Sequence, residues 1–496
     1  MSNTPEEQIS VVVFEGGKTE YREILTLSDH PDPAVRQSAE GIRVYTPGKD
    51  KVSPFRLNPL QAPQGTALDS HVDGVVGRLE AAQPMPGPLR PIVQEAIHDV
   101  HSAHPDPDNP PIMSELLPAA ETVLLRKGYS PPVYADLRGA LDVRLDQFTR
   151  GTIGRIFSCP WDSPSTDELI HSRSIIELAA LSVNALAFLL LCILAKIRAA
   201  VDAAGSSRKR LRLEIFIEEA HRVFGRSSSP VLSEGIADPK GHASEALITN
   251  MAEGRALGVG FTIIDSMPSL LPPEIHKNMA TRIVFGLTSS DDRQELGAHA
   301  LLDPVQVEEL GRLRPGEAFF LTEGFARPSR IRTVDIREEL GLTDPPSDAE
   351  LRGLLETKKW FHEKARSRAA MELQQVAREL DKCDAQRMGL LRDAAEIEER
   401  VVKCAASSQG KKELARLGRL ARNLAMRMDE MIRRLERGVC WGLLTDVPDP
   451  SPADPAISAA RQTLKKRYEH LTRVDVARFK VVMTGLVRRC AQASES

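Results

Sequence analysis

Short apolar, β-branched runs separated by helical stretches constrain the fold of this chain most strongly. The first run is ISVVVFE, which ends at Glu15. Such runs are typical of buried strands. Strands that alternate with helices predict an α/β fold with a largely parallel sheet covered on both faces. The further predicted strands lie near residues 41–46, 175–178, 211–217, 259–264, 282–287, 318–322 and 330–334, with helices at 184–204 and 242–257.

The C-terminal part of the chain follows a different pattern. Apolar residues recur alternately every three and four positions from Leu373 to Val401 and again from Leu414 to Leu435. These heptad seams predict two long helices, and the turn-like residues 406–412 between them predict an antiparallel hairpin. A Pro/Asp-rich linker at 446–455 precedes a last, basic helical segment.

One apolar run, Leu178 to Ala195, approaches the length of a membrane span. Glu177 and Lys196 bracket it closely, and Ser182 is placed as a helix N-cap would be. We therefore expect a buried strand followed by a buried helix, and no membrane. The N-terminus shows no signal-peptide pattern. The six scattered cysteines form no C-x-x-C pair, which predicts a cytoplasmic protein without a zinc or disulfide framework.

Charge is unevenly distributed along the chain. The net charge is −4, so a uniformly cationic nucleic-acid binder is excluded. Residues 353–496 nevertheless hold 29 Lys/Arg against 20 Asp/Glu, which leaves −13 for residues 1–352. The tail is thus the favoured place for an anionic partner. A solvated coiled-coil surface explains the same charges.

The strongest chemical signal is a predicted strand that ends in adjacent acids, Glu218-Glu219-Ala220-His221. A carboxylate at a strand end can hold Mg²⁺, and a second can polarise an attacking water, as nucleotide hydrolysis requires. Two solvated glutamates at the end of an ordinary strand give the same pattern.

Further motifs accompany this acid pair along the chain: Lys18-Thr-Glu-Tyr21-Arg22, Tyr45-Thr-Pro-Gly48, Leu57-Asn58-Pro59, Glu253-Gly-Arg255-Ala-Leu-Gly258-Val-Gly260, Asp265-Ser266, Asn278, Arg282 and Gly316-Glu317-Ala318. In this order, over roughly residues 8–340, the chain resembles HerA–FtsK-type P-loop ATPases of the HerA-like branch.

This resemblance implies a P-loop NTPase-like (RecA/FtsK-type) core, ATP and Mg²⁺ as cofactors, a usually hexameric ring, and movement along duplex DNA. It implies Glu218 as the magnesium-side acid and Glu219 as the general base. It also implies Arg255 and Arg282 as charge-stabilising arginines, although a surface or interface salt bridge explains either one equally well. Asp265 and Ser266 would form the sensor, where relatives usually carry Gln beside the acid. His221 would orient Glu219 or report on DNA, or it is a structural histidine.

The resemblance also predicts the division of the chain. The N-terminal part of the ATPase core is expected at residues 1–72, a helical insertion at 73–165 and the rest of the core at 166–340. A coiled-coil hairpin follows at 341–445, and the linker with the basic helix at 446–496.

The phosphate loop departs from the family pattern. Such a loop needs G-x-x-x-x-G-K-[ST], because its backbone amides wrap the phosphates and its lysine neutralises them. Gly17-Lys18-Thr19 is the single Gly-Lys-Thr of the chain, and Val12 stands where the first glycine should be. The resemblance places this segment on the second strand, so the first strand, the phosphate loop and its helix are expected to be absent.

Two functions follow as hypotheses. The first is the C-terminal part of a HerA-like ATP-dependent DNA translocase or helicase, which hydrolyses ATP once the loop is supplied; a nuclease or another effector protein is a candidate partner. The second is a degenerate, non-catalytic scaffold or DNA-binding subunit with a coiled-coil arm. A truncated product, a loop carried on a separate chain and a decayed ATPase all explain the missing motif.

Overall fold

The computed structural model describes residues 9–205, 210–226, 239–405, 411–437 and 455–495. Contacts divide the chain into two compact units. The first comprises residues 1–148 and 155–357, and the second comprises residues 149–154 and 358–496. The sequence predicted that the coiled-coil part begins at residue 341. In the structure the first unit ends at residue 357, so it holds 17 more residues than predicted. Residues 406–410 of the predicted turn at 406–412, and most of the linker at 446–455, lie outside the described residues.

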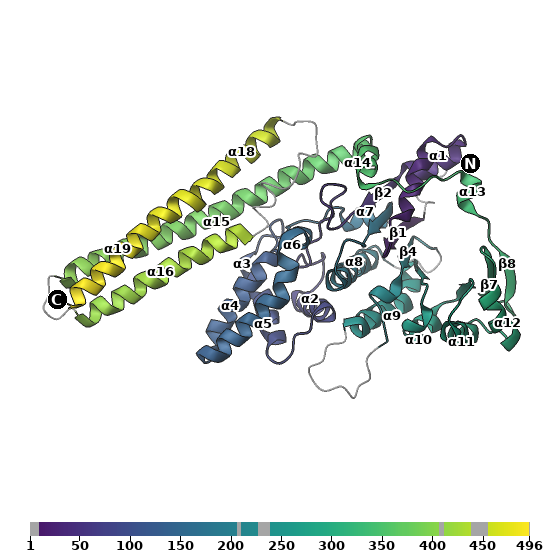
Figure 1. The fold of residues 1–496 in the computed structure, drawn as a ribbon, viewed down its shortest axis with the longest axis horizontal. Coiled ribbons are helices and arrows are strands. Elements are labelled where there is room, and N and C mark those ends of the chain that lie inside the picture. Colours follow the sequence, from purple (N-terminus) through teal and green to yellow (C-terminus); the bar gives the residue numbers. More distant parts are fainter. Residues whose placement is uncertain (1–8, 206–209, 227–238, 406–410, 438–454, 496) are drawn as a thin grey trace. The chain divides into compact units, whose positions relative to one another are not determined.

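The first unit is built on a five-stranded parallel sheet in the order β2-β3-β1-β4-β5. Figure 1 labels β1, β2 and β4 of this sheet. Every neighbouring pair in this sheet is parallel. The predicted parallel α/β core is therefore confirmed, with its apolar runs in the central strands. The strands are β1 (Ser10–Glu15), β2 (Ile42–Tyr45), β3 (Arg173–Glu177), β4 (Leu213–Glu218) and β5 (Val259–Ile264).

Helices connect and cover these strands. Several helices separated by loops lie between β2 and β3, and the short helices expected over residues 73–150 belong to this stretch. Its helices are α2 (Leu68–Ala82), α3 (Leu89–Ala103), α4 (Leu116–Lys127), α5 (Pro131–Thr149), α6 (Gly151–Phe157) and α7 (Thr166–Ile170). The unit's other α-helices are α1 (Pro33–Glu40), α8 (Val183–Ala203), α9 (Pro239–Leu257), α10 (Pro273–Asn278), α11 (Ser290–His299), α12 (Pro304–Glu309), α13 (Ile336–Leu340) and α14 (Asp348–Glu356).

Helix α8 contains most of the long apolar run. By length and composition it could cross a membrane, but 61% of its most apolar window is buried inside the protein. It packs against α2, α7 and α9. The Ser182 hydroxyl accepts a hydrogen bond from the Ala185 amide and so caps the helix, as expected from the sequence. The helix is a core element of the first unit.

Three predicted strands form a separate sheet. These are β6 (Thr281–Val284), β7 (Glu317–Thr322) and β8 (Ser329–Arg332), and both of their pairings are antiparallel. The sequence pattern predicted these strands but not their separate, antiparallel sheet. The connection from β7 to β8 is too short for a parallel pair, because parallel neighbours need a crossover of a dozen or more residues.

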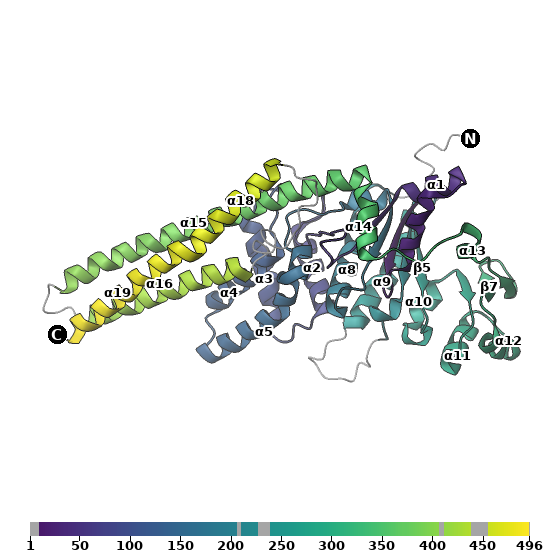
Figure 2. The same cartoon turned by 45° about the horizontal axis from the view of Figure 1, so that its top comes forward.

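The second unit is a bundle of long helices (Figure 2). Helices α15 (Lys359–Ala405) and α16 (Lys411–Arg437) bury the two predicted heptad seams against each other. Helix α18 (Pro455–Glu469) continues through a π-helical turn (His470–Asp475) into α19 (Val476–Glu495). Helix α19 packs on both α15 and α16. The buried residues of α19 repeat the same alternating spacing of three and four: Phe479, Met483, Leu486 and Cys490. The basic C-terminal segment therefore adds another helix to the bundle.

Candidate active site

Acidic side chains collect at one edge of the five-stranded sheet. Strand β1 ends in Glu15, β3 in Glu177 and β4 in Glu218, and Asp265 directly follows β5. The parallel register pairs Glu15 with Glu177 and Glu218 with Ile264. These acids therefore lie together at the carboxyl ends of the strands, where open α/β sheets bind their ligands.

Glu218 and Glu219 occupy different environments. Burial, and then the neighbouring charge of Glu219, raise the pKa of Glu218 above its ordinary value. Its Oε2 atom is buried and has no hydrogen-bond partner among the described residues. Glu219 adopts a left-handed backbone conformation with φ 51° and ψ 47°. That conformation is costly for a residue with a side chain and often marks a functional site.

The loop after β1 approaches this turn closely. A Cβ atom added to Gly16 would lie 2.5 Å from the Glu218 carbonyl oxygen, so only glycine fits there. Gly17 faces the Cγ atom of Glu219. The two glycines thus let the β1 loop pass directly beside the acid pair.

A polar network links the ends of β4 and β5. Asp265 accepts hydrogen bonds from the His221 amide, at 2.7 Å, and from the Met267 amide, at 2.7 Å. Its Oδ1 atom also lies 3.0 Å from His221 Nδ1. Ser266 Oγ donates to Glu219 Oε2 at 3.2 Å. The ligating atoms of Glu219, His221 and Asp265 lie within 4.8 Å of one another, close enough to share one cation.

The structure brings together Glu218, Glu219, His221, Asp265 and Ser266, as the sequence motifs led us to expect. It does not bring in either arginine. Arg255 is exposed near the end of α9, which leads into the amino end of β5. Because the acids lie at the carboxyl end of the strands, Arg255 is on the opposite edge of the sheet. Arg282 lies in the separate antiparallel sheet and donates from Nη2 to the His276 carbonyl.

Gly17-Lys18-Thr19 does not form a phosphate cradle. Lys18 pairs with Glu20 at 3.1 Å and points into solvent. The amides of Glu20 and Tyr21, which begin the 3₁₀ helix Glu20–Asp29, donate to Glu15 Oε1 at 2.6 and 3.2 Å. These two amides are therefore already bonded to Glu15 and are not free to bind a phosphate oxygen.

Glu15 itself is fully buried. Burial raises its pKa to about 8; the nearby Glu177 and Glu218 charges also raise it, while the Tyr21 and Glu20 amides act in the opposite direction. Its Oε2 atom has no partner among the residues described. The side chain is thus protonated over much of the neutral pH range.

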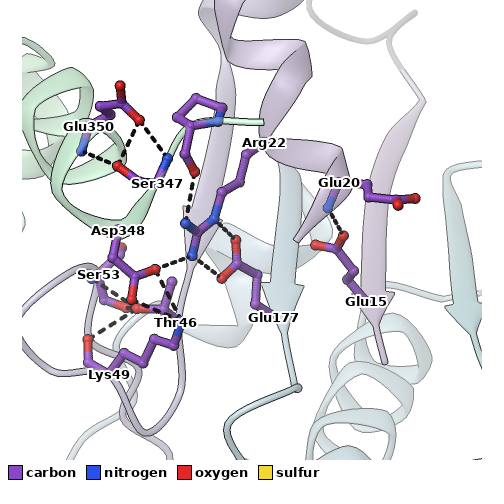
Figure 3. Close-up of polar contacts among 11 residues, drawn as sticks. Glu15, Glu20, Arg22, Thr46, Lys49, Ser53, Glu177, Ser347, Asp348 and Glu350 are labelled. Atoms are coloured by element: carbon purple, nitrogen blue, oxygen red, sulfur yellow. Dashed lines mark hydrogen bonds and ion pairs between the residues drawn. The ribbon is translucent and has the colours of Figure 1, made fainter. Parts of the chain in front are cut away.

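Beside Glu15, a buried ion-pair network joins β1, β3 and α14 (Figure 3). Arg22 donates to both carboxylate oxygens of Glu177, at 2.5 and 2.7 Å, and to Asp348 Oδ1 at 2.7 Å. Lys49 Nζ completes the network through Asp348, at 2.9 and 3.0 Å. The start of α14 is thus tied to the strand ends that surround the candidate site.

Sequence reasoning missed three of these acids. Glu15 and Glu177 both end a short apolar run, which is the same signal that identified Glu218. Asp348 carries no such signal. It lies 326 residues from Arg22 along the chain, so only the fold reveals the contact.

Comparison with known proteins agrees with the sequence motifs. No protein-family model matches the chain. A segment of 144 residues, 27% of the chain, is 26% identical to the DNA double-strand break repair helicase HerA of Pyrococcus furiosus. The match spans about a quarter, 26%, of that relative's length. The predicted resemblance to HerA–FtsK-type P-loop ATPases is confirmed.

Solved structures resemble the fold more loosely. VirB4 of Thermoanaerobacter pseudethanolicus is 13% identical with a TM-score of 0.47, over 67% of this chain and 84% of that one. The plasmid coupling protein TrwB, solved with ADP and Mg²⁺, is 12% identical with a TM-score of 0.41, over 69% and 88%. At these values neither structure carries an argument about activity.

Proposed function

We propose, from the resemblance to HerA–FtsK-type P-loop ATPases and from the acid edge of the sheet, that this chain is part of an ATP-driven DNA translocase or helicase. The main observation behind the proposal is the contact between the residues that follow β4 and those that follow β5. Glu218 and Glu219 follow one strand, Asp265 and Ser266 follow the next, and Ser266 contacts Glu219 directly. Paired acids beside a polar sensor are what hydrolysis of a phosphoanhydride requires.

The acids fit a hydrated divalent cation. Within the described part of the chain Glu218 Oε2 is buried without a hydrogen-bond partner, and carboxylate oxygens are the ligands that Mg²⁺ prefers. The described residues do not by themselves fit a triphosphate, because Glu15 takes the amides at the start of the 3₁₀ helix. Hydrolysis therefore needs a phosphate-binding loop in addition to the residues described here.

Within a completed site the residues would have distinct roles. Bound Mg²⁺·ATP would supply the phosphoryl group to be transferred. Glu218 would hold the cation. Glu219 would take a proton from the attacking water on a carboxylate oxygen, while the Ser266 hydroxyl fixes the orientation of that carboxylate. Asp265 holds the His221 backbone and ring, and so fixes the turn that carries Glu219.

Duplex DNA is the polymer along which we propose that the protein moves. The excess of basic residues lies in residues 353–496, and several of these, among them Arg419, Arg422 and Arg488, are exposed on the helical bundle. Phosphate contacts by such side chains give salt-dependent, sequence-independent binding, as a translocase needs. A cytoplasmic ring of identical subunits, with Arg255 and Arg282 acting on a neighbour's nucleotide, completes the proposal. A nuclease or another effector is its candidate partner.

A non-catalytic scaffold is the second candidate. The place of Arg255 at the opposite edge of the sheet, the bond of Arg282 to the His276 carbonyl and the occupied amides at Glu20 and Tyr21 favour it. The strained Glu219 turn favours catalysis instead, because a scaffold gains nothing from the cost of a left-handed glutamate.

The test is phosphate release from Mg²⁺·ATP with a Gly-x-x-x-x-Gly-Lys-[Ser/Thr] segment supplied, with and without duplex DNA. Our proposal predicts hydrolysis that DNA stimulates. Glu253→Gln, a change at an exposed glutamate of α9 that pairs with Arg198 of α8, is the matched control and should leave the rate unchanged. DNA binding without hydrolysis would favour the scaffold.

A further inference from the structure

A cavity of about 140 Å³ lies in the first unit, between α2, α8 and the loop that precedes α2. Its lining includes Gln61 and Thr66 of the loop, His71 and Arg78 of α2 and Lys196 of α8. None of the acids at the carboxyl ends of the strands lines it. A cavity of about 150 Å³ can hold a molecule the size of benzene, so this one admits a small molecule and excludes a nucleotide.

Arg78 is the lining residue whose side chain is least satisfied. It is half-buried, and its Nε atom is buried without a hydrogen-bond partner within the part of the chain that the structure describes. Among the described residues no carboxylate forms an ion pair with it. The guanidinium faces the thiol of Cys192, which is a poor acceptor and carries no charge. A partly buried guanidinium without a counter-ion is costly, and a bound anion would remove that cost.

The other cation of the cavity does not change this balance. Lys196 Nζ lies 2.6 Å from Asp162 Oδ2, and both side chains are largely buried. The Asp162 Oδ1 atom is also occupied, because it accepts a hydrogen bond from the Asn58 amide. The Lys196–Asp162 pair is neutral as a whole, so the positive charge of Arg78 remains uncompensated at the cavity wall.

His71 responds to this positive charge. Burial and then the charge of Arg78 lower its pKa to about 4, and His101 and Lys196 act in the same direction. Its Nε2 atom donates to the Leu60 carbonyl at 3.1 Å, which acts in the opposite direction. The ring is therefore neutral at neutral pH, and it lies in a positive electrostatic potential.

The amino end of α2 adds a second feature that favours an anion. The helix has 15 residues, and its N-cap residue, Ala67, makes no side-chain hydrogen bond to the first-turn amides. Thr66 and Ser70, on either side of the helix start, both line the cavity and are exposed at its mouth. A helix N-terminus carries partial positive charge and free amides, which stabilise anions.

We propose that this cavity binds a small oxyanion, the carboxylate or phosphate group of a molecule of a few atoms, with Arg78 as its counter-ion. The planar guanidinium offers paired N–H donors that match two oxygens of such a group. The hydroxyl groups of Thr66 and Ser70 are further donors at the mouth. The proposal is independent of the proposed function of the acid edge, because the two sites share no residue.

Ordered water is the alternative occupant. Polar cavities of this size commonly hold water, and a water molecule can accept the hydrogen bond of Arg78 Nε. Water does not neutralise the charge of Arg78, however, and it leaves the pKa of His71 low. An anion would raise that pKa, so the state of His71 distinguishes the two occupants.

The experiment is a nuclear magnetic resonance titration of the full chain with isotope-labelled histidine rings, in which a His71→Gln variant identifies the His71 signal. The probes are sodium phosphate and sodium acetate, with sodium chloride at matched ionic strength as the reference. We expect a saturable change of the His71 signal with phosphate, acetate or both, and a rise of the His71 pKa in the saturated protein. Whichever probe binds more tightly identifies the preferred head group.

Two variants locate the binding. Arg78→Met should weaken the response of His71 at least about tenfold, because the charge-assisted hydrogen bonds are lost. Arg90→Met, at an exposed arginine of α3 that pairs with Glu80 and does not line the cavity, is the matched control and should leave the affinity unchanged. Ala195→Leu fills the cavity without a change of charge and should abolish binding, which keeps the test decisive if Arg78→Met fails to fold.

Three results would overturn the proposal. The first is no saturable response of His71 to phosphate or acetate, and the second is an equal response to chloride. The third is a response that persists unchanged in Arg78→Met or in Ala195→Leu. The first result would leave water as the occupant, and the other two would mean that the anions act elsewhere on the protein.

Discussion

Arg22 and Glu177 form a buried bidentate ion pair, with Nε–Oε1 and Nη2–Oε2 distances of 2.5 and 2.7 Å. Their side chains are 2% and 3% exposed. The pair joins the segment after β1 to the end of β3. Through Asp348 it also holds α14, the last α-helix of the first unit, beside the acid edge.

Removal of one partner of this pair should be strongly destabilising. Arg22→Met leaves the Glu177 charge buried without a counter-ion, which typically costs about 3–5 kcal/mol. Thermal and denaturant unfolding of the full chain measure the effect. Arg36→Met, a half-exposed arginine that donates to the carbonyls of His30 and Pro31, is the control and should cost under about 1 kcal/mol. Equal effects at both positions would contradict the assigned importance of the Arg22–Glu177 pair.

Glu15 should make stability depend on pH. Its folded-state pKa of about 8 lies above the ordinary value of 4.5, so the folded protein binds the extra proton between these limits. Stability from this group is complete below about pH 4.5 and is lost as pH rises toward 8. Glu15→Gln mimics the protonated form and keeps an acceptor for the Glu20 and Tyr21 amides.

The variant should therefore match the wild type near pH 5 and exceed it at pH 8.5 by at least about 1 kcal/mol, the equivalent of one pKa unit. Denaturant titrations at both pH values measure this. Glu20→Gln, at an exposed position, serves as the control. A constant difference at the two pH values would show that Glu15 is ionised throughout.

Replacement of Glu219 by glycine should raise the stability of the protein and abolish its activity. Its φ of 51° is strained for any residue with a Cβ atom, and glycine relieves that strain. We expect Glu219→Gly to stabilise the chain by about 1 kcal/mol and to abolish hydrolysis in a completed site. Leu301→Gly, at another non-glycine residue with positive φ, should stabilise comparably without any effect on hydrolysis. A destabilised Glu219→Gly protein would mean that contacts of the side chain outweigh the backbone strain.

The basic bundle surface should bind DNA through phosphates. Arg419, Arg422 and Arg488 are exposed, and their joint replacement by alanine should weaken duplex binding and lower the slope of log K against log salt by about 0.9 per lost phosphate contact. Fluorescence anisotropy at several salt concentrations measures both. Arg332→Ala, on the edge of β8, is the control. If the slope of log K against log salt does not change, these arginines do not contact DNA phosphates, and the bundle surface would instead bind protein partners.

The sequence predicted the parallel core well because its strands are short apolar runs, and it located the acid pair because Glu218 ends such a run. The sequence-based predictions failed where the pairing of strands or the place of a residue depends on how consecutive elements are connected. The short β7–β8 turn forces antiparallel pairing, and Arg255 precedes β5, so it lies at the amino edge and away from the acids. The Arg22–Asp348 contact joins residues too distant along the chain for local patterns to reveal.

The most direct test of the account is the rate of phosphate release from Mg²⁺·ATP by the chain with a phosphate-loop segment supplied, compared between wild type and Glu219→Gln. Glutamine keeps the size of the side chain but cannot take a proton. We predict that the variant binds nucleotide as tightly as the wild type and loses at least about 100-fold in rate, the range of a general base. Equal rates in the two proteins would contradict the central claim that Glu219 at the end of β4 is the catalytic base.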